Sequence, residues 1–358
     1  MHKKLFIPGP VEVHEDVLKA MSAPMLAHRG KDYEDLHKGV KGKLQKLLYT
    51  NGNVFLITSS ATGAMEGSIR NLSEKRILST TCGAFSERWY QICLENGKEA
   101  DQLAVEWGNA VKPEMIESQL ATGKYDAITL VHSETSTGLL NPLEDIANVV
   151  RKFPDVMFIV DAVSSLVTVK IEPERLGIDL LLAGVQKGFG LPPGFTVVYV
   201  SERAMKKAEN VKNRGSYFNL TELKKFDEKN QTPNTPSISH IYALDLQLNK
   251  FLSEGLDNRF ARTLEMAKYT RSWAENRFKL FPEKGYEAVG LTSVSNTRGI
   301  SVKKLNDELT RQHSCVISDG YGKIKEKTFR IAHMADITME EIKSLLRWID
   351  EIVDKKLC

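Results

Sequence analysis

Seven short apolar runs recur through the first 200 residues of the chain, with segments of helical length between them. Several runs, such as Leu180–Val185, are apolar throughout rather than at alternate positions, which is typical of strands covered on both faces in a mostly parallel sheet. The intervening segments have the length and spacing of crossover helices, so the pattern predicts an α/β architecture. The expected strands are Val54–Thr58, Arg76–Thr81, Ala100–Trp107, Ala127–His132, Met157–Val163, Leu180–Val185 and Phe195–Val200. The expected helices are Ala64–Leu72, Glu87–Asn96, Pro113–Leu120 and Pro142–Phe153.

The pattern changes after residue 200. Residues 201–230 are lysine-rich and amphipathic, which is typical of solvated helices, and two prolines in QTPNTPS end any helix there. A long helical pattern follows over 238–278, and the remainder indicates shorter strands and helices. A chain of 358 residues usually forms two domains, since single cores stop growing near about 250–300 residues. We therefore expect a large α/β domain over residues 15–245 and a smaller α+β domain over 246–358, joined by residues 1–14.

The charges of the chain are balanced and dispersed, since 49 basic and 46 acidic residues give a formal net charge of +3. No basic patch for nucleic acid is visible, so the expected partner is a small molecule. No stretch of about 20 apolar residues could span a membrane, and prolines interrupt the amino terminus before a signal-peptide core develops, so we expect a cytoplasmic protein. The cysteines form no CxxC or Cys/His pairing, which suggests neither a metal site nor a disulfide framework. They are Cys82, Cys93, Cys315 and Cys358.

The residues that carry chemistry follow the expected strands, where a parallel sheet has its ligand site. After Val54–Thr58 comes SSATGAMEG, in which Ser60 and Thr62 open a helix whose free amides and dipole could hold an anion. Serine and threonine are also ordinary helix caps, so this pattern alone leaves both interpretations open.

Two ionisable residues stand at the ends of neighbouring runs. Asp161 ends the stretch FIVD, where a carboxylate costs free energy unless a cation or backbone N–H groups satisfy it. Lys187, 26 residues later, is either a surface lysine on a loop or a partly desolvated amine with a lowered pKa. An anion cradle, a carboxylate and a lysine at three strand ends match the phosphate, ring nitrogen and aldehyde of pyridoxal phosphate. The ordered set therefore predicts a pyridoxal phosphate site with the lysine bonded to the cofactor.

The sequence resembles the class V aminotransferases of pyridoxal phosphate fold type I, in particular their alanine–glyoxylate and serine–pyruvate branch. The resemblance covers essentially the whole chain. It implies a homodimer whose subunit has a mostly parallel seven-stranded sheet with helices on both faces, plus the smaller α+β domain. It depends on these motifs in this order: IPGPVEV, APMLAHRGKDYEDL, SSATGAMEG, GAFSERW, HSETSTGLLNPL, FIVDAVSSL, AGVQKGFGLPPG, QTPNTPSI and GYGKIKEKTFRIAHM.

By position, the resemblance implies a role for each residue of the cofactor site. Lys187 bonds to the cofactor aldehyde and later moves the α-proton, while Asp161 pairs with the pyridinium nitrogen. Phe85 stacks on the ring where many relatives have tryptophan; without the family it would be assigned to the core. The other implied contacts are Ser60, Ala61 and Thr62 at the phosphate, Thr135 at the phenolic oxygen, and Val163 and Gln186 beside the cofactor. Without the family, Thr135 and Gln186 would be a strand-end hydroxyl and a surface amide.

Further residues are implied for the substrate and the partner subunit. Thr232 matches a residue that relatives send across a dimer interface to the neighbouring subunit's phosphate, although Lys229 replaces the tyrosine often found three positions earlier. Arg330 corresponds to the arginine that binds the substrate α-carboxylate; otherwise it would form a surface salt bridge. Gly9 is implied at the substrate, and Arg29 either binds a substrate phosphate or anchors a loop.

The resemblance implies a transaminase that moves an amino group between a small amino acid, alanine or serine, and a 2-oxo acid, glyoxylate or pyruvate. Phosphoserine aminotransferase is the alternative. The His-Arg pair that it would carry shortly before Arg330 is replaced here by Lys323 and Lys325.

Two other classes are less consistent with the residues. A cysteine desulfurase usually has histidine where this chain has Gln186, and Cys315 lies in an apolar, strand-like run rather than a mobile loop. A dinucleotide-binding protein would carry GxGxxG after its first strand, and a catalytically silent module would not need Lys187, Asp161 and Arg330 together.

Overall fold

A computed structural model describes residues 2–357 of the chain, with side chains to residue 355. The strands of its larger sheet are β2 (Asn53–Ile57), β3 (Arg76–Thr81), β4 (Glu99–Ala104), β5 (Ala127–Val131), β8 (Met157–Asp161), β9 (Leu180–Gly184) and β10 (Thr196–Val200). They lie in the order β2-β10-β9-β8-β5-β3-β4. Only β10 runs antiparallel to its neighbours, so the predicted seven-stranded, mostly parallel sheet is confirmed.

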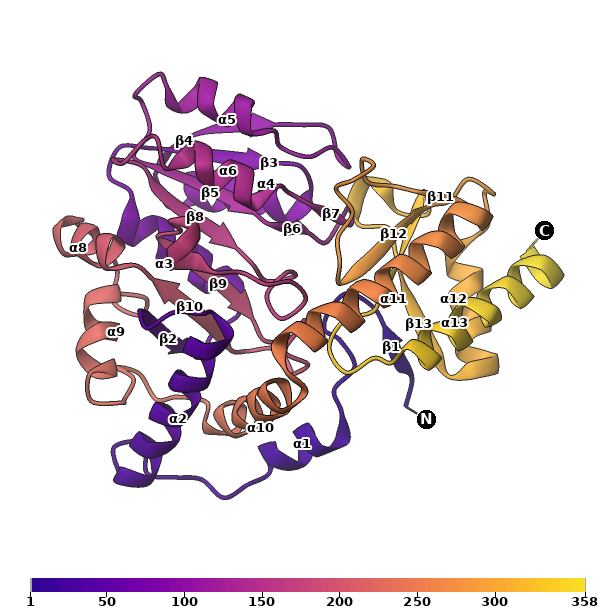
Figure 1. Ribbon diagram of the computed structural model, residues 1–358, viewed down its shortest axis with the longest axis horizontal. Helices are drawn as coiled ribbons and strands as arrows, with labels where there is room; N and C mark the ends of the chain where they lie inside the picture. The colour runs from indigo at the N-terminus through magenta and orange to yellow at the C-terminus, as the bar shows by residue number, and fades with distance from the viewer. Residues whose placement is uncertain (1, 358) are drawn as a thin grey trace.

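Helices cover both faces of this sheet because successive apolar residues of its strands point to opposite sides (Figure 1). In β8, Phe158 and Val160 join one hydrophobic cluster, whereas Met157 and Ile159 join the other. The first cluster includes residues of α1 (Glu15–Met21), α2 (Lys31–Leu47), α5 (Pro113–Leu120), α6 (Leu143–Val150), α7 (Pro173–Leu176) and α10 (Ile238–Glu254). The second includes residues of α3 (Ala61–Leu72), α4 (Ala84–Glu95), α8 (Glu202–Asn210) and α9 (Leu220–Asp227).

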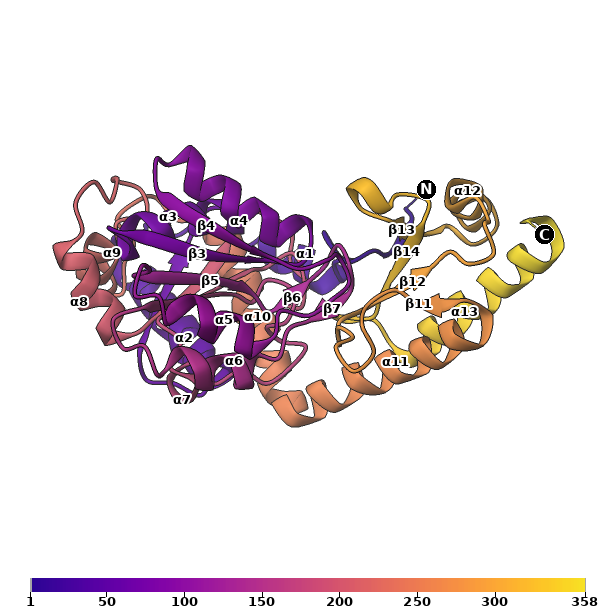
Figure 2. The same ribbon diagram turned by 90° about the horizontal axis from the view of Figure 1, so that it is seen from above.

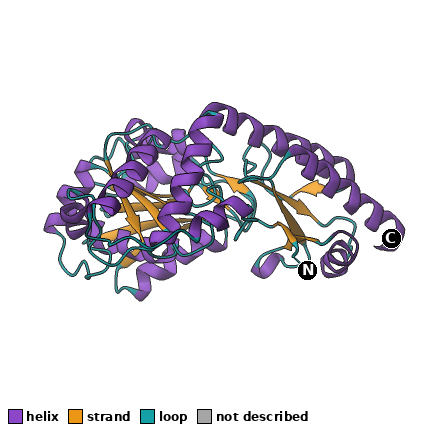
Figure 3. Cartoon of the chain, turned by 90° about the horizontal axis from the view of Figure 1, so that it is seen from below, coloured by secondary structure: helices purple, strands orange, loops and turns teal. Residues whose placement is uncertain are grey.

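A second, smaller sheet lies beside the first (Figure 2). Its strands, in spatial order, are β1 (Lys4–Phe6), β13 (Cys315–Asp319), β14 (Thr328–Ala332), β12 (Leu291–Ser295) and β11 (Lys279–Leu280). The amino-terminal β1 pairs in parallel with β13. Helices α11 (Leu256–Arg277), α12 (Val302–His313) and α13 (Met339–Ile352) bury apolar residues against this sheet (Figure 3). The remaining elements are the β6 (Ser133–Glu134) and β7 (Leu139–Leu140) ribbon, the 3-10 helix Gly322–Ile324 and the π-helix Val353–Leu357.

Some elements differ from the sequence-based expectations. The helical pattern over residues 238–278 forms two helices, because Gly255 between α10 and α11 has φ +84°, a conformation that favours glycine. The strands and helices before residue 53 have no counterpart among the expected elements. Helix α10 continues through residues 245 and 246, so the domain boundary expected there stays a prediction. Within the described residues, every helix is too short or too polar to cross a bilayer.

Candidate active site

One pocket lies where the carboxyl ends of β2, β8 and β9 meet the start of α4. It has about 460 Å³ not filled by protein atoms, part of which is open to solvent, and we call it the Lys187 pocket. Nine of the ten residues predicted for the cofactor line it, and only Thr232 does not. The nine are Ser60, Ala61, Thr62, Phe85, Thr135, Asp161, Val163, Gln186 and Lys187.

Lys187 is a buried amine, only 7% exposed, on the segment that follows β9. Its Nζ lies 3.4 Å from the Thr135 hydroxyl oxygen and has no ion-pair partner among the described side chains. Burial, followed by the charge of Arg330, lowers the pKa of Lys187 from 10.5 to about 7, against the opposing effect of Asp161. A large fraction of the amine is therefore neutral near pH 7, as a nucleophile or a base requires. The alternative of a surface lysine is wrong.

Asp161, the last residue of β8, is 3% exposed. Trp89 donates its indole N–H to Oδ2 at 3.0 Å, and the backbone N–H of Val163 donates to Oδ1 at 2.9 Å. Burial nevertheless raises the pKa of Asp161 to about 6, although these two hydrogen bonds lower it. Since no cation bonds to the carboxylate within the described residues, it can still pair with a positively charged group of a ligand.

Helix α3 begins at the edge of the pocket. Its N-cap, Ser60, is exposed and extended, and no side chain caps the helix. The N–H groups of Ala61 and Thr62 belong to the first turn, which has no hydrogen-bond acceptors within the helix. Free amides and a helix dipole at this edge of the pocket are the groups that an anion site requires.

Phe85, the second residue of α4, lines the pocket rather than the core. Its ring centre lies 5.3 Å from that of Tyr321 and 5.6 Å from Lys187 Nζ. The buried carboxylate of Glu134 accepts the backbone N–H groups of Phe85 at 3.3 Å and Ser86 at 2.9 Å. Glu134 therefore caps the first turn of α4 and fixes the position of the aromatic ring.

Arg330 on β14 is 6% exposed. Its guanidinium donates to the carbonyl oxygen of Thr135 at 3.1 Å and to that of Asp319 at 2.9 and 3.2 Å. Burial lowers its pKa to about 10. Within the described residues it has carbonyl acceptors but no carboxylate partner, so the alternative of a surface salt bridge is wrong. Thr135 joins the two cationic groups, since its hydroxyl faces Lys187 and its carbonyl binds Arg330.

Gly9 packs directly against the lysine. A Cβ atom at this position would lie 2.7 Å from both Cδ and Cε of Lys187, and the backbone has φ +132°. Any other residue would displace the lysine side chain and strain the backbone. The amino-terminal segment is therefore a wall of the pocket.

Thr232 and Arg29 lie together outside the pocket of their own chain. The hydroxyl of Thr232 donates to the carbonyl of Asn234 at 2.7 Å. Arg29 donates to the carbonyls of Thr232 at 2.7 Å and Pro233 at 3.2 Å, and it lies 5.1 Å from the ring centre of Phe226. In one chain Arg29 anchors the loop that carries Thr232. The contact of Thr232 with a neighbouring subunit stays a prediction.

Eight residues at or next to the pocket were not predicted: Met65, Arg88, Trp89, Val131, Ser133, Glu134, Ser164 and Tyr321. Trp89 and Arg88 follow Phe85 by four and three residues on α4, which places them on the same helix face. That spacing was visible in the sequence. Ser164, whose hydroxyl lies 2.5 Å from that of Thr135, had no such signal.

Three residues that were considered for another function or for the phosphate site lie outside the Lys187 pocket. Cys315 is buried in β13 of the smaller sheet, and burial raises its pKa to about 11, so it is a structural thiol. Lys323 places its ammonium 4.1 Å from the ring centre of Trp107. Lys229 is exposed after α9.

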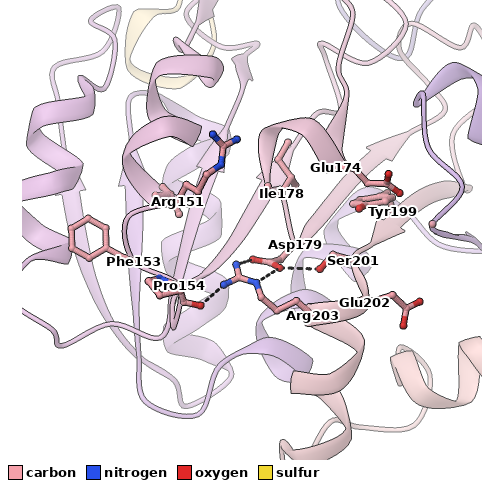
Figure 4. A pocket seen from close by; sticks show the side chains of 13 residues that line it. Arg151, Phe153, Pro154, Glu174, Ile178, Asp179, Tyr199, Ser201, Glu202 and Arg203 are labelled. Atoms are coloured by element: carbon pink, nitrogen blue, oxygen red, sulfur yellow. Dashed lines mark hydrogen bonds and ion pairs between the residues drawn. The ribbon is translucent and has the colours of Figure 1, made fainter.

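A larger pocket, of about 1010 Å³, lies at the amino ends of the parallel strands, and we call it the amino-end pocket (Figure 4). Its buried acid, Asp179, pairs with Arg203, which also lines the pocket. Asp179, directly before β9, accepts Arg203 Nε at 2.9 Å, the Ser201 hydroxyl at 2.9 Å and the backbone N–H of Phe158 at 2.8 Å. None of the predicted site residues lines it.

The sequence matches the family Aminotransferase class-V over residues 12–345. The chain therefore belongs to this family, which confirms the resemblance seen in its motifs, and it is an aminotransferase. The family implies pyridoxal phosphate as the cofactor.

Individual relatives share most of the chain. An uncharacterised aminotransferase of Methanocaldococcus jannaschii is 37% identical over 97% of this chain and 92% of that protein. The L-aspartate–glyoxylate aminotransferase of Paracoccus denitrificans is 30% identical over 93% of this chain and 87% of that protein. The crystal structure of alanine–glyoxylate aminotransferase from Nostoc sp. superimposes with a TM-score of 0.92 at 27% identity, over 99% of this chain and 96% of that chain.

Proposed function

We propose that this chain is a pyridoxal-phosphate-dependent transaminase that moves an amino group between alanine or serine and glyoxylate or pyruvate, as a homodimer in the cytoplasm. One observation carries the proposal: Lys187 and Asp161 are both buried, line the same pocket and lack ion-pair partners among the described residues. Burying two such charges costs free energy, so they favour a ligand that satisfies both.

The pocket fits the chemistry of the cofactor. The start of α3 suits a phosphate, Asp161 suits a protonated ring nitrogen, and the Lys187 amine suits an aldehyde. Two further polar atoms of pocket-lining residues, Ser133 Oγ and Gln186 Oε1, have no hydrogen-bond partner in the described structure. Such buried atoms normally bond to something, so they are consistent with a polar ligand.

When bound, pyridoxal phosphate supplies an electron sink for the bonds at the amino-acid α-carbon. The residues of the chain supply orientation and proton transfer. Arg330 offers its guanidinium to the α-carboxylate of the amino acid. Thr135 contacts both Lys187 and Arg330, so the amine lies close to the arginine. Lys187 Nζ takes the α-proton and later returns it, because a pKa of about 7 suits both steps. The ring of Phe85, 5.6 Å from Lys187 Nζ, offers an aromatic face beside the amine.

The identity of the substrates is supported by names of relatives and by the residues. The Paracoccus and Nostoc proteins differ in the named donor, aspartate or alanine, but share glyoxylate as acceptor. Phosphoserine is a weaker candidate because its phosphate needs a free cation. Arg29, the candidate in the sequence, does not line the Lys187 pocket of its own chain and anchors the loop of Thr232 and Pro233 instead.

A half-reaction panel tests the proposal. Purified protein is incubated with pyridoxal phosphate, and the visible absorbance band of the lysine-bound cofactor is followed after adding alanine, serine, aspartate or phosphoserine. We expect alanine or serine to remove the band fastest and glyoxylate to restore it. A protein that stays colourless after incubation with the cofactor would contradict the proposal, and faster reaction with phosphoserine would favour the alternative.

A further inference from the structure

Two segments far apart in the chain lie next to the two cationic groups, Lys187 in the pocket and Arg330 beside it. One is 187–190, which begins with Lys187. The other is 335–336, which follows β14 with its Arg330. The segments meet at the junction of α10 and α11, and α11 continues from there along the smaller sheet (Figure 2). Two buried side chains from these helices bind both segments at once.

Arg259, in the first turn of α11, is one of them and is 2% exposed. One guanidinium nitrogen, Nη2, donates to the carbonyl of Ala335 at 3.1 Å and to that of Gly188 at 3.4 Å. The other, Nη1, donates to the carboxylate of Glu254 at 3.0 Å. The guanidinium also lies 3.8 Å from the ring centre of Phe251. Besides Glu254, the buried guanidinium therefore has acceptors from both segments, and a shift of either segment would remove one of them.

Gln247 on α10, which is fully buried, repeats the arrangement. Its amide nitrogen donates to the carbonyl of Phe189 at 2.8 Å and to Asp336 Oδ2 at 3.1 Å. The neighbouring Gly190 has φ +70°, and a Cβ there would lie 2.8 Å from the same amide nitrogen. Glycine at 190 therefore permits the close contact of Gln247 with the lysine segment.

We propose that Arg259 and Gln247 are positioning residues for the transfer reaction, because they fix the segment of Lys187 relative to the segment that follows Arg330. This inference rests on the proposed function, in which Arg330 holds the α-carboxylate and Lys187 takes the α-proton. The distance between Lys187 Nζ and the Arg330 guanidinium determines how well the amine is aligned with the α-carbon of the bound amino acid. An error of about 1 Å in such a position costs about 10²-fold in rate.

The neighbouring Arg262 provides a matched control. It binds the same carbonyl of Ala335 at 3.1 Å and the same Glu254, but no contact with residues 187–190 is among its hydrogen bonds or ion pairs in the described structure. Arg262→Lys therefore removes comparable hydrogen bonds to residues 335–337 and leaves residues 187–190 unaffected. Arg259→Lys keeps the charge but cannot reach both carbonyls and Glu254 with one ammonium. Gln247→Met keeps the approximate size and loses the amide.

The kinetic test compares the half-reaction of alanine, the proposed donor, with that of its α-deuterated form. For Arg259→Lys and Gln247→Met we expect a rate about 10–100-fold lower, a larger isotope effect because proton transfer becomes slower, and a KM changed by less than about 3-fold. Arg262→Lys should keep the wild-type rate and isotope effect. Wild-type values in both test variants, or equal losses in all three variants, would overturn the inference.

Amide hydrogen exchange of the protein without added cofactor gives a readout independent of activity. Arg259→Lys and Gln247→Met should speed exchange in both 187–191 and 335–337, whereas Arg262→Lys should speed it only in 335–337. Exchange confined to one segment in the two test variants would overturn the inference. If the wild-type protein performs no half-reaction with any donor, the proposed function fails, while the exchange pattern still reports whether the two segments are coupled.

Discussion

The two ends of the large sheet hold charged side chains in opposite situations. At the carboxyl ends lie Lys187 and Asp161, with Arg330 of the smaller sheet next to them; all three are less than a tenth exposed, and none has an ion pair in the described structure. At the amino ends, Asp179 is as deeply buried but is bound by Arg203, a hydroxyl and a backbone N–H group. The amino-end pocket is the larger of the two.

This difference in ion pairing distinguishes charged side chains that maintain the fold from charged side chains that are available to a ligand. Breaking a buried ion pair destabilises a fold, whereas buried charges that have hydrogen bonds but no ion-pair partner cost free energy in the isolated chain and favour a ligand that pairs with them. Volume alone would select the amino-end pocket as the candidate site, although none of the predicted site residues lines it. Substitutions at matched positions of the two ends test this distinction.

The largest contrast is expected between Lys187→Ala and Lys207→Ala. Lys207 pairs with Asp126 at 3.2 Å near the amino ends. Lys187→Ala should abolish the visible cofactor band and lower transamination by about 10²–10⁴-fold or more, because the amine is both attachment point and base. Lys207→Ala should change neither quantity. Half-reaction kinetics and absorbance spectra measure both, and transamination retained in Lys187→Ala would rule out the proposed mechanism.

The second contrast pairs two buried acids. Asp161→Asn should lower kcat by about 10²–10³-fold, because the ring nitrogen loses its anionic partner, with little loss of folding stability. Asp179→Asn should leave kcat unchanged and lower the free energy of unfolding by about 1–3 kcal/mol. Denaturant unfolding and steady-state kinetics of both variants check this. A stability loss in Asp161→Asn as large as in Asp179→Asn would remove the distinction between the two ends.

The third contrast pairs two arginines. Arg330→Ala should raise the KM for the amino acid, with a loss of about 2–4 kcal/mol in transition-state binding for a charged contact. Arg203→Ala, at the amino ends, should leave KM unchanged and lower the melting temperature. Steady-state kinetics with the best donor of the panel provide the values. An unchanged KM in Arg330→Ala would assign this residue a purely structural role.

The smallest effect concerns pH. Because the native pKa of Lys187 is lowered to about 7, the unfolded chain binds a proton between about pH 7 and 10.5 that the native chain lacks. This residue therefore makes the cofactor-free protein more stable as pH rises through that range, by at most about 1.4 kcal/mol per pH unit. Asp161, with a pKa of about 6, is ionised in both states above that value and contributes little there.

Unfolding of the wild type and of Lys187→Met at pH 7.5 and 9 isolates this contribution. The gain in stability from pH 7.5 to 9 should be smaller in the variant than in the wild type. Equal gains in the two proteins would show that the lysine keeps an ordinary pKa in the fold.

Much of the pocket could be predicted because its residues lie in short motifs at strand ends. A parallel sheet brings such ends together, so Asp161, Lys187 and the start of α3 could be assigned to one site without coordinates. The strand pairing of the smaller sheet was harder to predict, because β1 is three residues long and its partner β13 lies about 300 residues later in the chain. No local pattern specifies a pairing over that separation.

Interactions between side chains were the least predictable part. Arg259 and Arg262 stand three residues apart on one helix, yet only the first contacts the lysine segment. The bond from Trp89 to Asp161 likewise depends on how α4 crosses the end of β8. Helical spacing places a residue on a face, but the partner opposite that face is set by tertiary packing.

The pairing of β1 with β13 has a consequence for how the protein is made. The ribosome delivers Lys4–Phe6 long before it reaches Cys315, the start of the partner strand. Gly9, three residues after β1, covers the Lys187 side chain. A nascent chain that has not reached β13 therefore lacks one attachment of this wall, and keeps the bond from Val11 N–H to the carbonyl of Gln186.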